Sequence, residues 1–102
     1  MSGKNRPLDP ETAEVVAERF RALGDPTRLL ILDYLRRRDE RAVGEIAAQV
    51  GGSQQNISKH LSVLRVQRIV ARRKQGTKTL YRVADPAVHR LCDGALGVET
   101  DP

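Results

Sequence analysis

Aromatic side chains are scarce in this sequence of 102 residues, which contains only Phe20, Tyr34 and Tyr81. Their scarcity argues against a protein that binds single-stranded nucleic acid or RNA, because such proteins stack bases on aromatic platforms. It also means that the core must be built from Leu, Ile, Val and Ala.

The sequence has one cysteine, Cys92, so it cannot form an internal disulfide. No apolar run approaches the roughly 20 residues that span a membrane, and the residues after Met1 lack the apolar region of a secretory signal. We therefore expect a soluble, cytoplasmic protein. The length suits one domain, and we expect a disordered tail over residues 1–8 and a single folded domain over residues 9–102.

Acidic residues are absent from Ile46 to Ala84, a stretch of 39 residues. This stretch carries a formal charge of +8, whereas the rest of the chain sums to −3. A basic segment favours a polyanionic partner, because Lys and Arg placed against phosphates release condensed counterions. Since stacking platforms are missing, double-stranded DNA is the favoured partner. The eight cations are Lys59, Arg65, Arg68, Arg72, Arg73, Lys74, Lys78 and Arg82.

Three Asp-Pro pairs each precede an apolar run of helical period. Asp accepts a hydrogen bond from a free backbone N–H at a helix start, and Pro is tolerated at the first helical position. The second of these helices is apolar on most sides and should lie at the centre of the core. Its basic end, Arg36 to Arg38 with Arg41, is either a phosphate patch or a solvated helix terminus. The predicted helices span residues 10–23, 26–37 and 86–96.

A helix-turn-helix is predicted between these elements. A short helix over residues 43–50 is followed by Gly51-Gly52, and Ser53 is placed to cap a further helix over residues 54–66. That helix has an apolar face of Ile57, Leu61 and Leu64 and an opposite face of amides, hydroxyls and one cation. Such a face suits base reading, since Gln and Asn pair with adenine in the major groove and Ser and Lys contact bases or phosphates.

A β-hairpin follows, with strands over residues 69–74 and 78–84 joined by Gln75-Gly76-Thr77. Its cations suit a wing that contacts the DNA backbone, with Arg72 and Lys74 on one face and Arg73 on the other. The alternative is that these charges protect an edge strand against aggregation. The residues predicted to contact DNA are Ser53, Gln54, Gln55, Asn56, Ser58, Lys59, Ser62, Arg65, Arg72, Arg73, Lys74 and Lys78.

The predicted fold is mainly helical with one small hairpin, a winged helix-turn-helix with the order α-α-α-α-β-β-α. The first and last helices are amphipathic and lie at the two ends of the chain, so we expect them to form a homodimer with a second copy. The residues predicted at this interface are Val16, Phe20, Val88, Leu91, Cys92 and Ala95.

These motifs resemble the ArsR/SmtB family of dimeric winged helix-turn-helix repressors. The matching segments are the run from Asp25 to Leu32, Val43 to Ala47, Ser53 to Leu61 and Gly76 to Val83, and the resemblance covers roughly residues 20–85. It implies a repressor on a palindromic operator near its own promoter. It also implies release by an inducer, which in many members is a metal ion.

The metal sites of the family are not carried over. Members that sense soft metals often have a Cys-x-Cys pair before the third helix, where this chain has Ala42 and Gly44. Members with a nickel or zinc site on the last helix use an Asp-x-His pair, where this chain has Asp85 and Ala87.

One local metal site is considered instead. Asp85, His89 and Asp93 follow at i, i+4 and i+8, so on a continuous helix they share a face that would suit nickel or zinc. The structural alternative is that Asp85 caps the helix, His89 and Asp93 are solvated, and Cys92 is an apolar contact in the dimer seam. Redox sensing by Cys92 is a further hypothesis.

No arrangement typical of an enzyme is present. The sequence lacks a phosphate-binding Gly-rich loop, a pair of catalytic carboxylates and a Cys/His nucleophile. His60 is expected to pack or hydrogen-bond as a bracing group beside the apolar face of its helix. Two other functions stay open, a protein-interaction module and a nonspecific architectural DNA binder.

Overall fold

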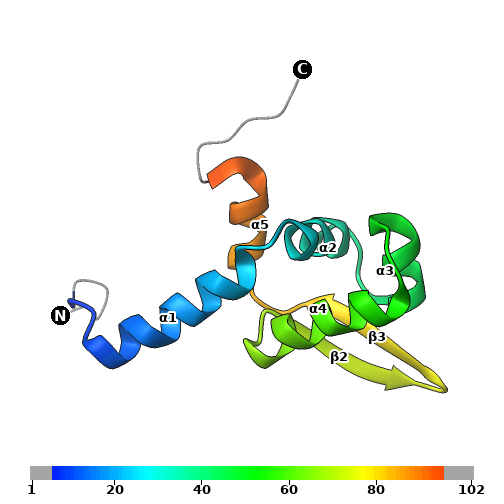
Figure 1. The fold of residues 1–102 in the computed structure, drawn as a ribbon, viewed down its shortest axis with the longest axis horizontal. Helices are drawn as coiled ribbons and strands as arrows, with labels where there is room; N and C mark the ends of the chain where they lie inside the picture. Colours follow the sequence, from blue (N-terminus) through cyan, green and yellow to red (C-terminus); the bar gives the residue numbers. More distant parts are fainter. Residues whose placement is uncertain (1–5, 96–102) are drawn as a thin grey trace.

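The computed structural model describes residues 6–95, which form five helices and a small antiparallel sheet at one edge of the fold (Figure 1). The predicted order of four helices, a hairpin and a last helix is confirmed, with one additional short strand. The elements are α1 (Pro10–Leu23), α2 (Pro26–Arg36), β1 (Arg41–Ala42), α3 (Val43–Val50), α4 (Gln54–Val66), β2 (Val70–Gln75), β3 (Lys78–Val83), α5 (Ala87–Arg90) and the segment η2 (Leu91–Ala95).

Two of the Asp-Pro helix starts have the predicted capping bonds. The Asp9 carboxylate accepts a hydrogen bond from the Thr12 N–H at 2.7 Å. The Asp25 carboxylate accepts one from the Arg28 N–H at 3.1 Å. α1 ends at Leu23 as predicted, whereas α2 ends one residue earlier than predicted.

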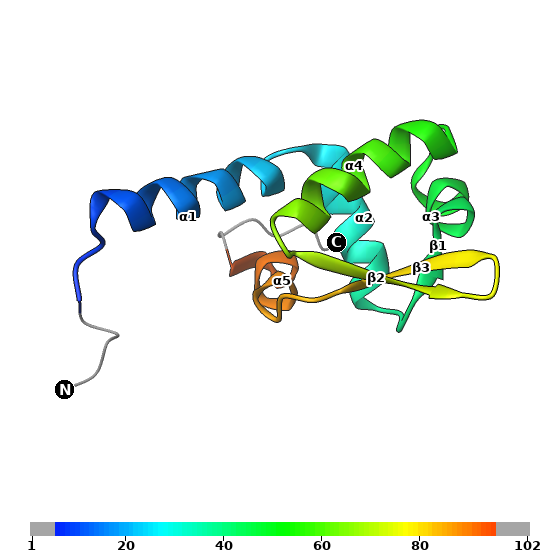
Figure 2. The ribbon, with the colours of Figure 1, turned by 90° about the horizontal axis from the view of Figure 1, so that it is seen from below.

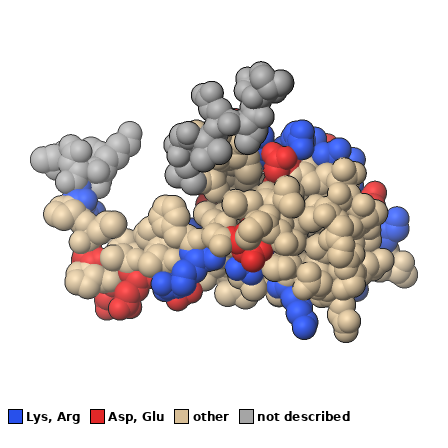
Figure 3. Space-filling model, turned by 45° about the horizontal axis from the view of Figure 1, so that its top comes forward, with Lys and Arg blue, Asp and Glu red and all other residues tan. Residues whose placement is uncertain are grey.

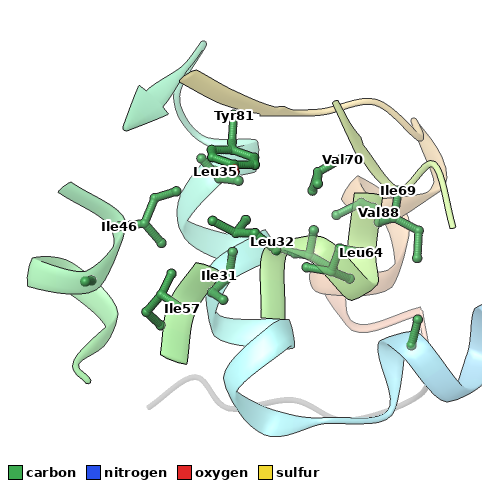
Figure 4. Close-up of a cluster of buried hydrophobic side chains, with 13 residues drawn as sticks. Ile31, Leu32, Leu35, Ile46, Ile57, Leu64, Ile69, Val70, Tyr81 and Val88 are labelled. Carbon is green, nitrogen blue, oxygen red and sulfur yellow. The ribbon is translucent and has the colours of Figure 1, made fainter. Parts of the chain in front are cut away.

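The core surrounds α2, as its apolar composition predicted. Ile31, Leu32 and Leu35 have no exposed surface. Figure 4 shows that they meet aliphatic side chains from α3, α4, the sheet and α5. Tyr81 is the one buried aromatic side chain within residues 6–95, so burial rests on aliphatic side chains.

The sheet has the strand order β1-β3-β2. The two residues of β1 were missed in the sequence because so short a strand has no readable alternation. The hairpin turn is tighter than predicted, since Gln75 pairs with Lys78 and only Gly76-Thr77 connect the strands. Gly76 has a φ of 63°, the left-handed region that glycine adopts at little cost.

α1 leaves the body as an arm, which Figures 1 and 2 show from two directions. Ala22 is its only buried residue, and the side chains of Val15 and Phe20 are each 61% exposed. The helix therefore packs on its own chain mainly through its C-terminal end. Within residues 6–95, much of its remaining apolar surface is exposed.

The prediction of one continuous helix over residues 86–96 is wrong within the described residues. α5 ends at Arg90, and η2 is interrupted by Gly94, whose φ of 88° is left-handed. Leu96, the predicted end, lies outside the described part of the chain. The N-cap of α5 is Pro86 and not Asp85 as predicted, although the Asp85 carboxylate accepts a hydrogen bond from the Ala87 N–H at 2.9 Å.

Candidate nucleic-acid interface

The turn between α3 and α4 is built by glycine and serine. Gly51 and Gly52 have φ values of 99° and 106°, which residues with a Cβ rarely adopt. The chain then reverses so that Ser53 caps α4, its Oγ accepting a hydrogen bond from the Asn56 N–H at 3.0 Å. This geometry is the predicted helix-turn-helix.

α4 is divided into a buried and an exposed face, as its sequence predicted. Ile57, Leu61 and Leu64 are completely buried. The predicted DNA-reading residues Gln55, Asn56, Lys59 and Ser62 are exposed, and Ser58 is half-buried. The exposed face continues to Val63 and Val66, which are 38% and 71% exposed.

The Gln54 side chain lies over the start of α3. A Cβ added to Gly44 would come within 3.1 Å of the Gln54 Nε2, so the glycine leaves room for this amide. Gln54 therefore packs against the first helix of the helix-turn-helix as well as standing at the start of α4.

The hairpin of β2 and β3, residues 70–83, forms a wing beside α4. In Figure 2 its tip points away from the outer end of α1. Arg72, Lys74 and Lys78 are exposed, as a backbone-contacting wing requires.

Two of the predicted cations have unexpected surroundings. Arg73 is not a free charge, because it donates two hydrogen bonds to Glu40. Arg65 is half-buried, and its Nε is buried without a hydrogen-bond partner among the described residues.

Arg19 connects α1 to the end of α4 and to Asp85, contacts that the sequence did not indicate. Its guanidinium donates to the carbonyl of Gln67, which caps the end of α4, and to the Asp85 carboxylate at 2.6 Å. The partners lie 48 and 66 residues away in the sequence, so no local pattern indicated them.

Three carboxylates that accept backbone hydrogen bonds at or just before helix starts make folding pH-dependent. The hydrogen bond from the Ala87 N–H, and then Arg19, hold the pKa of Asp85 below its ordinary value of 3.8. Backbone hydrogen bonds likewise lower two other pKa values: the Thr12 N–H lowers that of Asp9, and the Arg28 N–H lowers that of Asp25. A pKa that is lower in the folded state contributes stability that is complete above the unfolded value and is lost as the pH falls through the folded value.

We therefore expect the free energy of unfolding to fall as the pH is lowered from about 5 to below 3.8. Asp85→Asn should lower stability by about 1 kcal/mol at pH 7 and reduce this pH dependence. Urea titrations at several pH values measure both effects. Asp39→Asn is the control, because Asp39 is exposed and makes no hydrogen bond with a described residue; equal behaviour of the two variants would contradict the assignment.

His60 is a bracing group, as predicted. It is 18% exposed, its Nδ1 lies 3.4 Å from the Arg28 Nη1, and the same nitrogen lies 3.8 Å from the Asp25 carboxylate. Arg28 in turn donates from its Nε to the carbonyl of Ala22 at 2.7 Å. This cluster joins α4 to the junction of α1 and α2.

The candidate metal ligands do not converge. Asp85 is paired with Arg19, and Asp93 with Arg36 at 2.7 Å. Within residues 6–95 no three His, Cys, Asp or Glu side chains are placed to share a metal ion. Asp93 is exposed, as the structural alternative predicted, and it is also ion-paired. Burial raises the pKa of the Cys92 thiol, which disfavours the reactive thiolate that redox sensing needs.

The predicted dimer surface is present in part. Phe20 is exposed, and Val16, Leu91 and Cys92 are half-buried and partly accessible. Val88 offers no surface to a second copy, because it is 3% exposed within the core of its own chain. The side chain of Ala95 lies outside the described part of the structure.

A largely apolar cavity of about 330 Å³ lies between α1 and α5. Phe20, Leu23, Val88 and Leu91 line it, and Arg19 and Asp85 stand at its wall. Because Phe20 is at once a lining residue and largely exposed, the cavity is continuous with the free apolar surface of the arm.

Charge is distributed unevenly between the arm and the body. On the face drawn in Figure 3, acidic side chains gather on the outer part of the arm, with cations closer to the body, and cations and some acidic side chains lie along the rim of a largely neutral body. None of the helices described within residues 6–95 is both long and apolar enough to cross a membrane.

Comparison with known proteins identifies the family. Residues 25–72 match the family described as bacterial regulatory protein, arsR family. The chain is 42% identical over 103 residues to the nodulation protein NolR of Rhizobium meliloti, an alignment that covers 94% of this chain and 83% of that protein.

Solved structures agree with this assignment. One is the solution structure of the homodimeric winged helix-turn-helix DNA-binding domain of an ArsR-family protein from Mycobacterium bovis, with 35% identity and a TM-score of 0.74, covering 94% of this chain and 87% of that chain. Another is the antimony-specific transcriptional repressor AntR, with 33% identity and a TM-score of 0.76, covering 92% and 86%. The chain therefore belongs to the ArsR family of bacterial regulatory proteins and is a transcriptional regulator with a winged helix-turn-helix fold.

Proposed function

We propose that the protein is a homodimeric repressor that binds a palindromic operator, with α4 of each copy in a major groove. The observation that carries this proposal is the face of α4. It presents exposed amide, hydroxyl and ammonium groups directly after a helix-turn-helix turn, in a segment without acidic residues. Such groups match the donor and acceptor pattern of base edges.

The residues of this interface have different tasks in the proposal. Gln55, Asn56, Ser58, Lys59 and Ser62 read bases or contact phosphates from α4. Ser53 and Gln54 present the start of the helix. Arg65, Arg72, Lys74 and Lys78 supply cations for the DNA backbone, which positions the protein without specifying the sequence.

Dimerisation through α1 and the α5–η2 region supplies a second α4 helix, which binds the second half-site of the operator. The free apolar surface of the arm, with Phe20 and Val15 each 61% exposed, supports this assembly, as does the homodimeric relative. The cavity between α1 and α5 offers a recess that an apolar side chain of the second copy can fill. Two α4 helices in successive major grooves lie about 34 Å apart, one turn of DNA.

An inducer releases the repressor in this proposal, and a metal ion is one candidate. The antimony-specific relative AntR favours a metal. The residues of this chain do not form a metal site. Asp85 and Asp93 are paired with arginines, and no three metal-binding side chains converge within residues 6–95. We therefore assign no metal-dependent step, and other inducers remain to be tested beside nickel and zinc.

The test is a titration of the purified protein onto fluorescent DNA from upstream of its own gene, with a scrambled duplex alongside. A repressor binds the upstream DNA far more tightly, typically by 10³ or more at physiological salt. Added nickel or zinc should leave this preference unchanged if the arginine pairs persist. Loss or gain of the preference with metal would instead assign ligands to Asp85, His89 and Asp93.

Two other outcomes separate the alternative functions. A nonspecific architectural DNA binder would bind both duplexes equally and weaken steeply with salt. A protein-interaction module would bind neither duplex appreciably at physiological salt.

A further inference from the structure

Arg73 differs from the other wing cations because it already has a partner. Its Nε and Nη2 donate to the two carboxylate oxygens of Glu40 at 2.6 and 2.7 Å. Arg72, Lys74 and Lys78 make no hydrogen bond or ion pair with any described residue. The two parallel bonds use the planar fork of the guanidinium, which fixes direction as well as distance.

The pair crosses the sheet. Glu40 directly precedes β1 and Arg73 lies in β2, whereas β3 runs between them. In register, Ala42 and Arg73 both lie opposite Leu80 of the central strand. The pair therefore ties the outer strand of the wing to the segment that leads directly into α3, the first helix of the helix-turn-helix.

The same pair removes the free charge of Arg73. The hydrogen bonds from Arg73 lower the pKa of Glu40, and Glu40 raises the pKa of Arg73, so both are ionised at neutral pH and their charges cancel. A neutral pair adds little to counterion release when DNA binds. The Glu40 side chain is only 21% exposed and Arg73 is 49% exposed, so the carboxylate is the more enclosed partner.

We propose that Glu40 and Arg73 are positioning residues, a brace that holds the wing at the angle at which Arg72, Lys74 and Lys78 reach the DNA backbone. The brace rests on the proposed DNA-binding function, because it assigns these two residues a task within that interface. It replaces the direct phosphate contact that the sequence predicted for Arg73.

The direction in which Glu40→Gln changes operator affinity distinguishes a brace from a phosphate contact by Arg73. If the pair is a brace, Glu40→Gln loosens the wing and weakens operator binding by roughly three- to tenfold, although it removes a negative charge near DNA. If Arg73 contacts phosphate, the same change frees its guanidinium and strengthens binding.

A double-mutant cycle completes the test on the full chain. Glu40→Gln, Arg73→Gln and the double variant should weaken operator binding by similar factors, because each breaks the same pair. The loosened wing still makes its phosphate contacts when it binds, at the cost of ordering it, so none of the three should change the slope of log K against log salt. The control Lys78→Gln removes an exposed, unpaired wing cation and should reduce the magnitude of that slope by about 0.9. A similar reduction for Arg73→Gln, or tighter binding by Glu40→Gln, overturns the brace.

Amide hydrogen exchange tests the brace without DNA. The brace predicts faster exchange in β2 and β3 for both single variants and no further increase in the double variant, with Lys78→Gln like the wild type. Unchanged exchange in all variants overturns it. If the wild type does not prefer its own upstream DNA, the proposed function fails, yet this exchange experiment still decides whether the pair holds the wing.

Discussion

Phe20→Glu is expected to convert the dimer into monomers and to weaken operator binding by at least about 100-fold, because the two half-sites are then no longer bound as one unit. Phe20 is 61% exposed in the single chain, so the chain itself does not need this side chain for its core. In the proposed dimer the same ring packs against the second copy, where a carboxylate would be desolvated without a partner. Sedimentation and operator titration measure the two effects.

Leu30→Glu is the matched control for this change. Leu30 is 56% exposed on α2 and lines a groove with Val50 of α3, and no residue of α1 lines that groove. The Leu30→Glu variant introduces the same charge at an exposed apolar position, and it should leave both the dimer and the operator affinity nearly unchanged. A Phe20→Glu variant that stays dimeric would contradict the assignment of the arm to the interface.

Gln55→Ala should weaken operator binding by about 1–3 kcal/mol, or roughly 5- to 150-fold, with little effect on random DNA. Gln55 is exposed on α4 and makes no hydrogen bond with a described residue, so its amide is free to pair with a base. Truncation to Ala removes both the donor and the acceptor but keeps helix propensity. Titrations onto operator variants should show at which base pair the Gln55→Ala variant no longer distinguishes one base from another.

Gln49→Ala is the control for this prediction. Gln49 is also an exposed helical glutamine, but it lies on α3 and faces the groove beside α2. Its loss should change neither affinity nor specificity. Equal losses on operator and random DNA for Gln55→Ala would contradict base reading by α4.

Local sequence signals predicted most of the fold. Asp9 and Asp25 cap their helices through hydrogen bonds to a backbone N–H three residues ahead, so these caps need no contact with distant parts of the chain. The Gly51-Gly52 turn and the Ser53 cap followed from the same local chemistry. The faces of α4 were predictable because its apolar residues recur with the helical period.

The errors arose where distant parts of the chain decide the structure. β1 forms only because β3 offers it a partner. Arg73 looked like a free cation because Glu40 lies 33 residues away. Arg19 was overlooked for the same reason, since its two partners lie 48 and 66 residues away in the sequence.

The prediction of one continuous last helix failed for a local reason that periodicity does not reveal. Its apolar spacing is helical, but Gly94 adopts a left-handed conformation that ends the regular turn. Asp85 lies before α5 and Asp93 lies in η2, so the three candidate metal ligands do not lie on one regular helix, and two of them are paired with arginines.

The most direct test of sequence-specific, dimeric DNA binding is selection from a pool of random DNA duplexes at physiological salt. The account predicts enrichment of a palindromic sequence whose half-sites are centred about one helical turn apart, and loss of preference at defined positions for Gln55→Ala. Enrichment of single half-sites, or of no common sequence, would contradict it.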